Sequence, residues 1–142
     1  MRTIQNLGML ILALVFATAT MTAQAKTTKM DKMAKMDKKE TAYKGYLVDK
    51  MCATGFTKSG DVKKATEKAK KHTSDCALED HCQASGYGLV IDGKFHKFTA
   101  AGDTLALSYL NKTKRENDIY VSVMGTAKGD QIDVTSIKDA KE

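Results

Sequence analysis

An Asp-Gly pair, Asp92-Gly93, places the strongest constraint on how this chain can fold. It lies between two short runs rich in β-forming residues, residues 87–91 (YGLVI) and 94–98 (KFHKF). Two residues of this type between two such runs are typical of a tight β-hairpin. The sequence therefore predicts an antiparallel pair of strands in the middle of the chain, around which the other elements must be arranged.

Hydrophobic periodicity predicts further strands and helices on both sides of this hairpin. In chain order we expect a strand at 43–48, a turn at 49–55, a helix at 59–72 capped by Ser59, a helical turn at 76–83, strands at 87–91 and 94–98, a helix at 104–110, and strands at 119–124 and 131–137. Without the segment between the first two strands, this is the element order of the OB-fold, a five-stranded barrel with a helix between strands 3 and 4.

We therefore expect a mainly β protein with two helices. Its architecture would be a small five-stranded OB-like barrel with a helical, Cys-containing insert between strands 1 and 2. The alternative is an open five-stranded sheet in an α+β sandwich.

The N-terminal residues have the pattern of a secretory signal peptide. Arg2 is followed by an apolar run at 7–19 and then by the small-residue pattern Ala23-Gln24-Ala25. The apolar run is shorter than the ~20 residues that a membrane-spanning helix needs. We expect export to the periplasm or the medium and a soluble mature protein without a transmembrane segment. The expected parts are a signal peptide at 1–25, a flexible Lys/Met-rich linker at 26–41, one domain at 42–138 and a frayed C-terminus at 139–142.

The positive charge of the chain is concentrated in two segments. The net charge is +6, and residues 26–40 and 58–71 each carry six lysines. Arg2 and Arg115 are the only arginines, whereas phosphate recognition favours the planar fork of arginine. We therefore interpret the lysines as solvated surface and expect no nucleic-acid partner.

The three cysteines, Cys52, Cys76 and Cys82, cannot all pair within one chain. Export would place them where disulfides persist, so one thiol stays free, two chains are linked, or the thiols bind a metal. We expect a disulfide between Cys52 and Cys82, with Cys76 as the alternative partner of Cys52 and Cys76–Cys82 as a third pairing. A Cys52–Cys82 bond closes a loop of about 30 residues and would contribute roughly 3–4 kcal/mol. The third cysteine could then link a homodimer.

The same residues also suggest a metal site formed by Cys52, His72, Cys76 and Cys82. Three thiolates and one imidazole suit tetrahedral Zn(II), or Cu(I) at lower coordination number. His72 and Cys76 are four residues apart, which places both on one face of a helix if the helix continues that far. The spacing contains no C-x-x-C pair.

A third hypothesis is thiol redox catalysis, which requires a thiolate activated by a nearby cation or a helix N-terminus. The sequence contains no C-x-x-C, G-x-S-x-G, H-E-x-x-H or phosphate-loop pattern. We therefore expect no catalytic residue and rank an enzymatic role last.

Several short motifs of the chain resemble those of a group of small exported bacterial proteins that are mostly labelled uncharacterised. The motifs are GYLVD followed by Cys52, then His72, Cys76 and Cys82, then SGYG at 85–88, DGKF at 92–95 and the closing run VSVMGTAKGDQIDVTSIK. The resemblance covers residues 43–138. It implies export and an OB-like domain, and it brings no established activity.

The sequence as a whole favours an exported, non-enzymatic binding or envelope-associated domain that is stabilised by a disulfide and whose ligand is unknown. The alternative function is a periplasmic metal-binding protein that binds Zn or Cu through Cys52, His72, Cys76 and Cys82.

Overall fold

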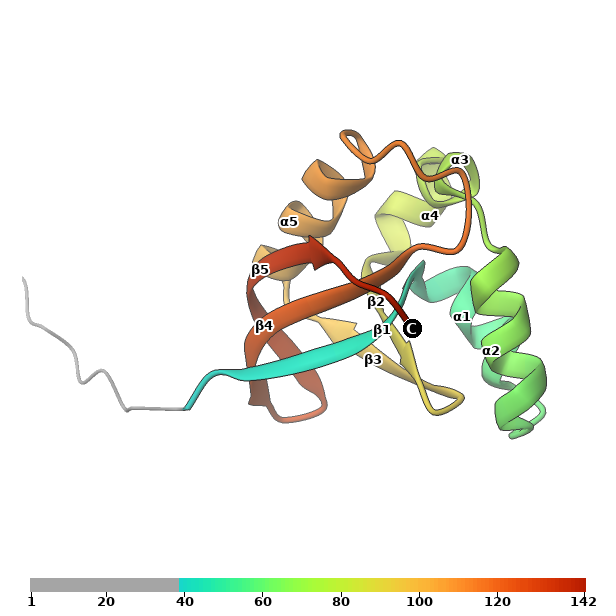
Figure 1. Cartoon of the computed structure of the whole chain (residues 1–142), viewed down its shortest axis with the longest axis horizontal. Coiled ribbons are helices and arrows are strands. Elements are labelled where there is room, and N and C mark those ends of the chain that lie inside the picture. The colour runs from blue at the N-terminus through green and yellow to red at the C-terminus, as the bar shows by residue number, and fades with distance from the viewer. Residues whose placement is uncertain (1–38) are drawn as a thin grey trace, which may run out of the picture. The chain divides into compact units, whose positions relative to one another are not determined.

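The strands of this protein form one sheet that closes into a ring, as the computed structural model of residues 39–142 shows (Figure 1). The strands are β1 (Thr41–Asp49), β2 (Tyr87–Ile91), β3 (Lys94–Phe98), β4 (Tyr120–Lys128) and β5 (Gln131–Asp139). Around the ring their order is β1-β2-β3-β5-β4, and β4 pairs again with β1. The expected signal peptide and most of the expected linker lie outside the described residues.

Helices make up a larger part of the domain than the sequence predicts. Between β1 and β2 lie α1 (Lys50–Thr57), α2 (Val62–Lys71), α3 (Ser74–Ala77) and α4 (Asp80–Ser85), and between β3 and β4 lies α5 (Ala100–Leu110). The four helices of the insert gather on one side of the ring and α5 lies apart from them (Figure 1). The domain is therefore mixed α/β, with a helical, Cys-containing insert between the first two strands as predicted.

The β2–β3 hairpin has the bounds that the sequence predicts. Asp92 and Gly93 have φ values of 47° and 70°, as a two-residue turn with two positive φ angles requires. A Cβ atom on Gly93 would lie 2.7 Å from the Cα atom of Val62, the first residue of α2. The missing side chain thus lets the hairpin tip contact the start of α2, which fixes this helix beside the sheet.

The ring is closed by one short pairing. β3 and β5 run parallel and share only two residue pairs, Lys97 with Gln131 and Phe98 with Ile132. In contrast, β4 and β5 are paired antiparallel along their whole length. The sheet is therefore a ring with one narrow side rather than an evenly closed barrel.

Two hydrophobic cores lie on opposite faces of the sheet. Inside the ring, the core consists of side chains from the strands and α5, among them Leu47, Leu89 and Phe98. Outside the ring, Tyr46 and Val48 pack with residues of α1 and α2. Because alternate side chains of a strand point to opposite faces, the end of β1 is buried on both sides, which explains its continuous apolar run.

Two details of the insert differ from the sequence prediction. A turn is expected at 49–55, but residues 50–57 form the helix α1. The helix expected at 59–72 begins after Asp61, whose Oδ1 accepts a hydrogen bond from the Lys64 backbone N–H at 3.0 Å, and not after Ser59. It ends at His72, where the backbone becomes extended with ψ 135°. The prediction that His72 and Cys76 share one helix face was therefore wrong, since Cys76 lies on the separate helix α3.

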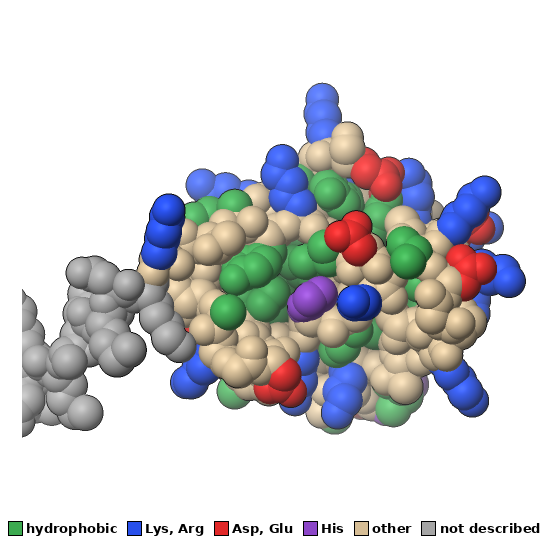
Figure 2. Space-filling view, turned by 90° about the horizontal axis from the view of Figure 1, so that it is seen from below, with side chains coloured by type: hydrophobic (Ala, Val, Ile, Leu, Met, Phe, Trp, Pro, Cys, Tyr) green, Lys and Arg blue, Asp and Glu red, His purple; other side chains and the backbone are tan. Residues whose placement is uncertain are grey.

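The surface is mixed in character. On the face shown in Figure 2, hydrophobic side chains gather beside one histidine, and Lys or Arg side chains project mostly around the edge. The last residues, expected to fray, make contacts in the structure: the Ala140 N–H donates to the Tyr120 carbonyl at 3.1 Å and Glu142 pairs with Lys70 at 3.0 Å.

Within residues 39–142, no helix has both the length and the apolarity to cross a membrane.

The contact between the hairpin and α2 can be tested with a matched pair of glycine substitutions. Gly93 and Gly129 both have positive φ, but a Cβ on Gly129 meets no atom within 4 Å. Gly129→Ala should lower the free energy of unfolding by about 1–2 kcal/mol through backbone strain alone. Gly93→Ala should cost about 1–3 kcal/mol more, because Val62 must move. Urea unfolding measures both, and equal losses would contradict a tight contact.

Candidate metal centre

A buried carboxylate, Asp49, organises the insert at the end of β1. Its side chain is fully buried, and its Oδ1 accepts a hydrogen bond from the Cys52 backbone N–H at 2.9 Å. This bond caps the N-terminus of α1, because an acceptor at this position satisfies a free N–H group of the first turn. Asp49 therefore fixes Cys52 in the first turn of the helix.

The other oxygen of Asp49 faces His72, at the end of α2. Oδ2 lies 3.0 Å from Nε2 of His72, whose side chain is only 3% exposed. The two atoms are at the distance of an ion pair. Apart from this ion pair, Asp49 Oδ2 and both ring nitrogens of His72 have no hydrogen-bond partner among residues 39–142. Buried polar atoms are normally partnered, and Nδ1 of His72 is left without a polar partner among the described residues.

The charge of Asp49 is stabilised inside the protein. Burial alone would raise the pKa of Asp49, but the contact with His72 and the Cys52 N–H outweigh burial and lower this pKa below its ordinary value of 3.8. Asp49 is therefore ionised at neutral pH, beside a buried imidazole.

The sulfur atoms gather around the same point. Cys52 Sγ lies 3.8 Å from Cys76 Sγ, and the ligand atoms of Cys52, His72 and Cys76 all lie within 4.8 Å of one another. The ligand atoms of a second set, Asp49, Cys52 and Cys82, also lie within 4.8 Å of one another. The structure thus brings together all four residues predicted from the sequence, in two sets that share Cys52, and this cluster can hold a metal ion.

Different helices supply these side chains. Cys52 comes from α1 and His72 from the end of α2, while Thr73 caps α3 by accepting a hydrogen bond from the Cys76 N–H at 3.1 Å. Cys82, on α4, is buried. Phe56 of α1 packs edge-on against the His72 ring, with ring centroids 5.7 Å apart. Four short helices therefore carry the cluster, where the sequence predicts one helix at 59–72 and a helical turn at 76–83.

All three cysteines are thiols in the structure. Burial and then the Asp49 carboxylate raise the pKa of Cys52, and the same two causes raise the pKa of Cys82 to about 11. These two thiols are therefore neutral at pH 7, unlike the activated thiolate of a redox enzyme. The Cys52–Cys82 disulfide stays a prediction, and the geometry also brings Cys76 close to Cys52.

His81 takes part in a different arrangement. Its Nε2 lies 3.3 Å from Glu79 Oε2 at the surface, where the His81 side chain is 59% exposed. Glu79, His81 and Cys82 form a third set of ligand atoms within 4.8 Å. Because exposed acidic pairs of this kind are common without a metal, we consider this set a weaker candidate.

An open pocket of about 550 Å³ lies in front of the first set. Its lining residues come from α1, α2, α3 and the short loop between α2 and α3: Cys52, Gly55, Phe56, Lys68, Lys71, His72, Thr73 and Cys76. Asp49 and Cys82 do not line it and are both buried. Sequence reasoning missed Asp49 and Phe56, although an Asp three residues before Cys52 has the spacing of a helix cap.

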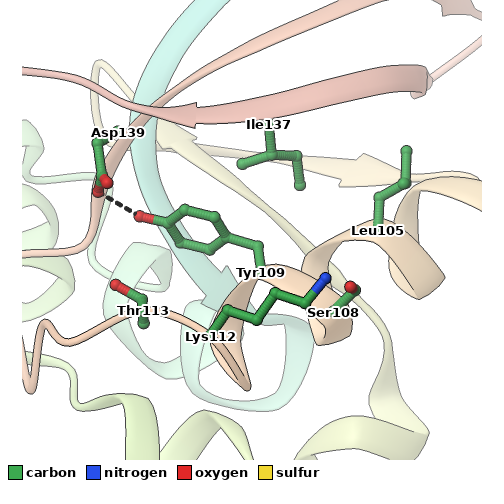
Figure 3. Close-up of a pocket in the computed structure, with 7 residues that line it drawn as sticks. All are labelled: Leu105, Ser108, Tyr109, Lys112, Thr113, Ile137 and Asp139. Atoms are coloured by element: carbon green, nitrogen blue, oxygen red, sulfur yellow. Dashed lines mark hydrogen bonds between the residues drawn. The ribbon is translucent and has the colours of Figure 1, made fainter.

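A second pocket, of about 330 Å³, lies between α5 and β5 (Figure 3). There the Tyr109 hydroxyl donates a hydrogen bond to Asp139 Oδ1 at 2.6 Å, and Leu105 and Ile137 form an apolar wall. Burial and this bond raise the pKa of Tyr109 to about 12. The polar groups at the base of this pocket thus satisfy each other, so the cysteine pocket is the better candidate for a functional site.

Comparisons with known proteins add no assignment, since no family model, no curated protein and no solved structure matches the chain.

The two contacts of Asp49 can be separated by substitution. Asp49→Asn keeps an acceptor for the α1 cap but removes the charge beside His72, and it should cost about 1–3 kcal/mol of unfolding free energy. Asp49→Ala removes the cap as well and should cost about 1 kcal/mol more. Chemical unfolding at pH 7 measures both, and equal losses for the two variants would contradict the capping role.

The lowered pKa of Asp49 also predicts a pH dependence. The charged form stabilises the fold above pH 3.8, and this stabilisation is lost as the pH falls below 3.8. The stability difference between the wild type and Asp49→Asn should therefore shrink as the pH falls from 5 to below 3.8. A difference that grows on acidification would contradict the assignment.

Proposed function

We propose that this protein binds a thiophilic metal ion through Cys52, His72 and Cys76. The observation that carries the proposal is the convergence of two half-exposed thiols on an imidazole that is buried and has no hydrogen-bond partner within the described residues. A bound metal would give one of the His72 nitrogens the partner that it lacks.

The carboxylate behind His72 supports this proposal. Histidines that bind metals usually direct their second ring nitrogen toward a carboxylate, which fixes the ring and increases its basicity. Asp49 Oδ2 lies 3.0 Å from Nε2 of His72. Nδ1 is therefore the nitrogen that we assign to the metal, and Asp49 is a positioning residue.

The charges at the site favour a divalent ion. Two thiolates and a neutral imidazole are balanced by Zn(II), whereas Cu(I) would leave one negative charge in excess beside the buried Asp49 carboxylate. Zinc sites that react or exchange ligands commonly have three protein ligands and one open position. The pocket in front of Cys52 and Cys76 supplies space for such a position. Cys82, which does not line the pocket, is not required as a ligand.

We also propose that the domain is an OB-like barrel and that the protein is exported. A ring of strand order β1-β2-β3-β5-β4 with a helix after β3 is consistent with an OB-like barrel. The pattern of residues 1–25 supports export, so the metal would be bound in the periplasm or outside the cell.

Metal binding and the expected disulfide compete for Cys52. The sulfur of Cys52 belongs to both sets of ligand atoms, and it can bond to Cys76 or Cys82 only by leaving the metal. The disulfide-stabilised domain that the sequence favours is then the oxidised, metal-free state of the same protein. In that state the remaining cysteine would be the one available to link a homodimer.

Titration of the reduced protein with Co(II), a spectroscopic substitute for Zn(II), tests the proposal. One equivalent should produce a sulfur-to-metal charge-transfer band, and Zn(II) should abolish it by displacement. Cys52→Ser and Cys76→Ser should each lower the affinity at least about tenfold, because each removes one ligand.

Two controls match these substitutions. His81→Ala removes an exposed histidine outside the pocket and should leave the titration unchanged. Cys82→Ala removes the buried cysteine and should preserve both the affinity and the band intensity. A loss of intensity in Cys82→Ala would show that Cys82 is a ligand, and the absence of any band in the wild type would refute the proposed function.

Oxidation provides a further prediction. After treatment with a small disulfide oxidant and its removal, the protein should contain one intramolecular disulfide that includes Cys52, and it should fail to bind Co(II). Peptide mapping by mass spectrometry identifies the partner, and a non-reducing gel detects a linked dimer. Full metal binding by a protein that contains a Cys52 disulfide would contradict the competition.

A further inference from the structure

Besides the three ligands, the pocket contains features that metal binding by the protein alone does not explain. At about 550 Å³ it is much larger than one water molecule and falls in the range of small-molecule sites. Its mouth is shaped by Phe56, which provides an apolar wall, and by Gly55, where a Cβ would meet no atom within 4 Å.

The charges around the pocket are also of one sign. None of its lining residues is acidic, and two are lysines, Lys68 and Lys71, which lie three positions apart on α2. Neither lysine forms an ion pair among residues 39–142, whereas Lys64 and Lys70 of the same helix do. With Zn(II) neutralised by two thiolates, the mouth of the pocket retains the positive charge of these two lysines.

We propose that the pocket is a binding site for a small thiol that carries a carboxylate, whose sulfur occupies the open position of the metal while its carboxylate lies at Lys68 and Lys71. This inference rests on the proposed metal site and specifies its ligand. The sulfur donor suits a thiophilic metal, and the two positive charges of Lys68 and Lys71 balance the two negative charges, thiolate and carboxylate, that the ligand brings. The ligand loses its thiol proton to solvent as the metal–sulfur bond forms, and no oxidant or reductant is required.

The test compares two small thiols of similar size on the reduced, Co(II)-loaded protein. The anionic thiol 3-mercaptopropionate should change the charge-transfer band at a concentration about five- to tenfold lower than neutral 2-mercaptoethanol does. Lys68→Ala combined with Lys71→Ala should abolish this preference and leave Co(II) loading unchanged. Lys63→Ala, on the same helix but outside the pocket, should retain the preference.

A steric variant tests the same site by a different route. Gly55→Leu places a side chain at the open mouth of the pocket and should weaken binding of both thiols while the metal still loads. Equal affinities for the two thiols in the wild type, or a preference that survives loss of both lysines, would overturn the proposed ligand site. If Co(II) produces no band at all, the proposed function fails instead, so the two failures are distinguishable.

Discussion

The contact of Asp49 with both Cys52 and His72 is the interaction on which the organisation of the insert depends. One carboxylate caps α1 through Oδ1 and faces the imidazole at the end of α2 through Oδ2. A buried charge is costly unless it has partners, so the first two helices must stay in position for Asp49 to remain ionised at the end of β1. The convergence of thiols and imidazole is a consequence, because Cys52 and His72 are the residues that Asp49 contacts.

This constraint compensates for the weak packing of the insert. The face that α2 buries is made of small residues, Ala65 and Ala69, which contribute little apolar area. Short helices with so little buried area are unstable alone and depend on tertiary contacts. The hairpin tip at Gly93 supports the start of α2, and Asp49 supports its end. One support comes from the turn between β2 and β3 and the other from the last residue of β1, so the sheet positions both ends of α2.

The sequence predicted the structure best where neighbouring residues alone determine the backbone conformation. Asp92-Gly93 predicted the hairpin correctly because the turn itself requires positive φ at both residues. The alternation of apolar residues predicted the other strands, and their ends proved longer because pairing with neighbours extends them. Helix α1 was missed because Gly55 and the threonines argue against a helix, although Asp49 has the spacing of its cap. The cluster residues were predicted by type, whereas the contacts of Asp49 and Phe56 with His72 are tertiary contacts that spacing does not encode.

The short pairing between β3 and β5 is the place where the sheet is expected to open most easily. In the ring this pairing lies away from β1, and it rests on two residue pairs. Local opening begins where the fewest interactions must break, so thermal fluctuations would separate β3 from β5 long before they reach Asp49. Opening there would leave the pairings of β1 with β2 and β4 intact, and these pairings hold Asp49 at the end of β1.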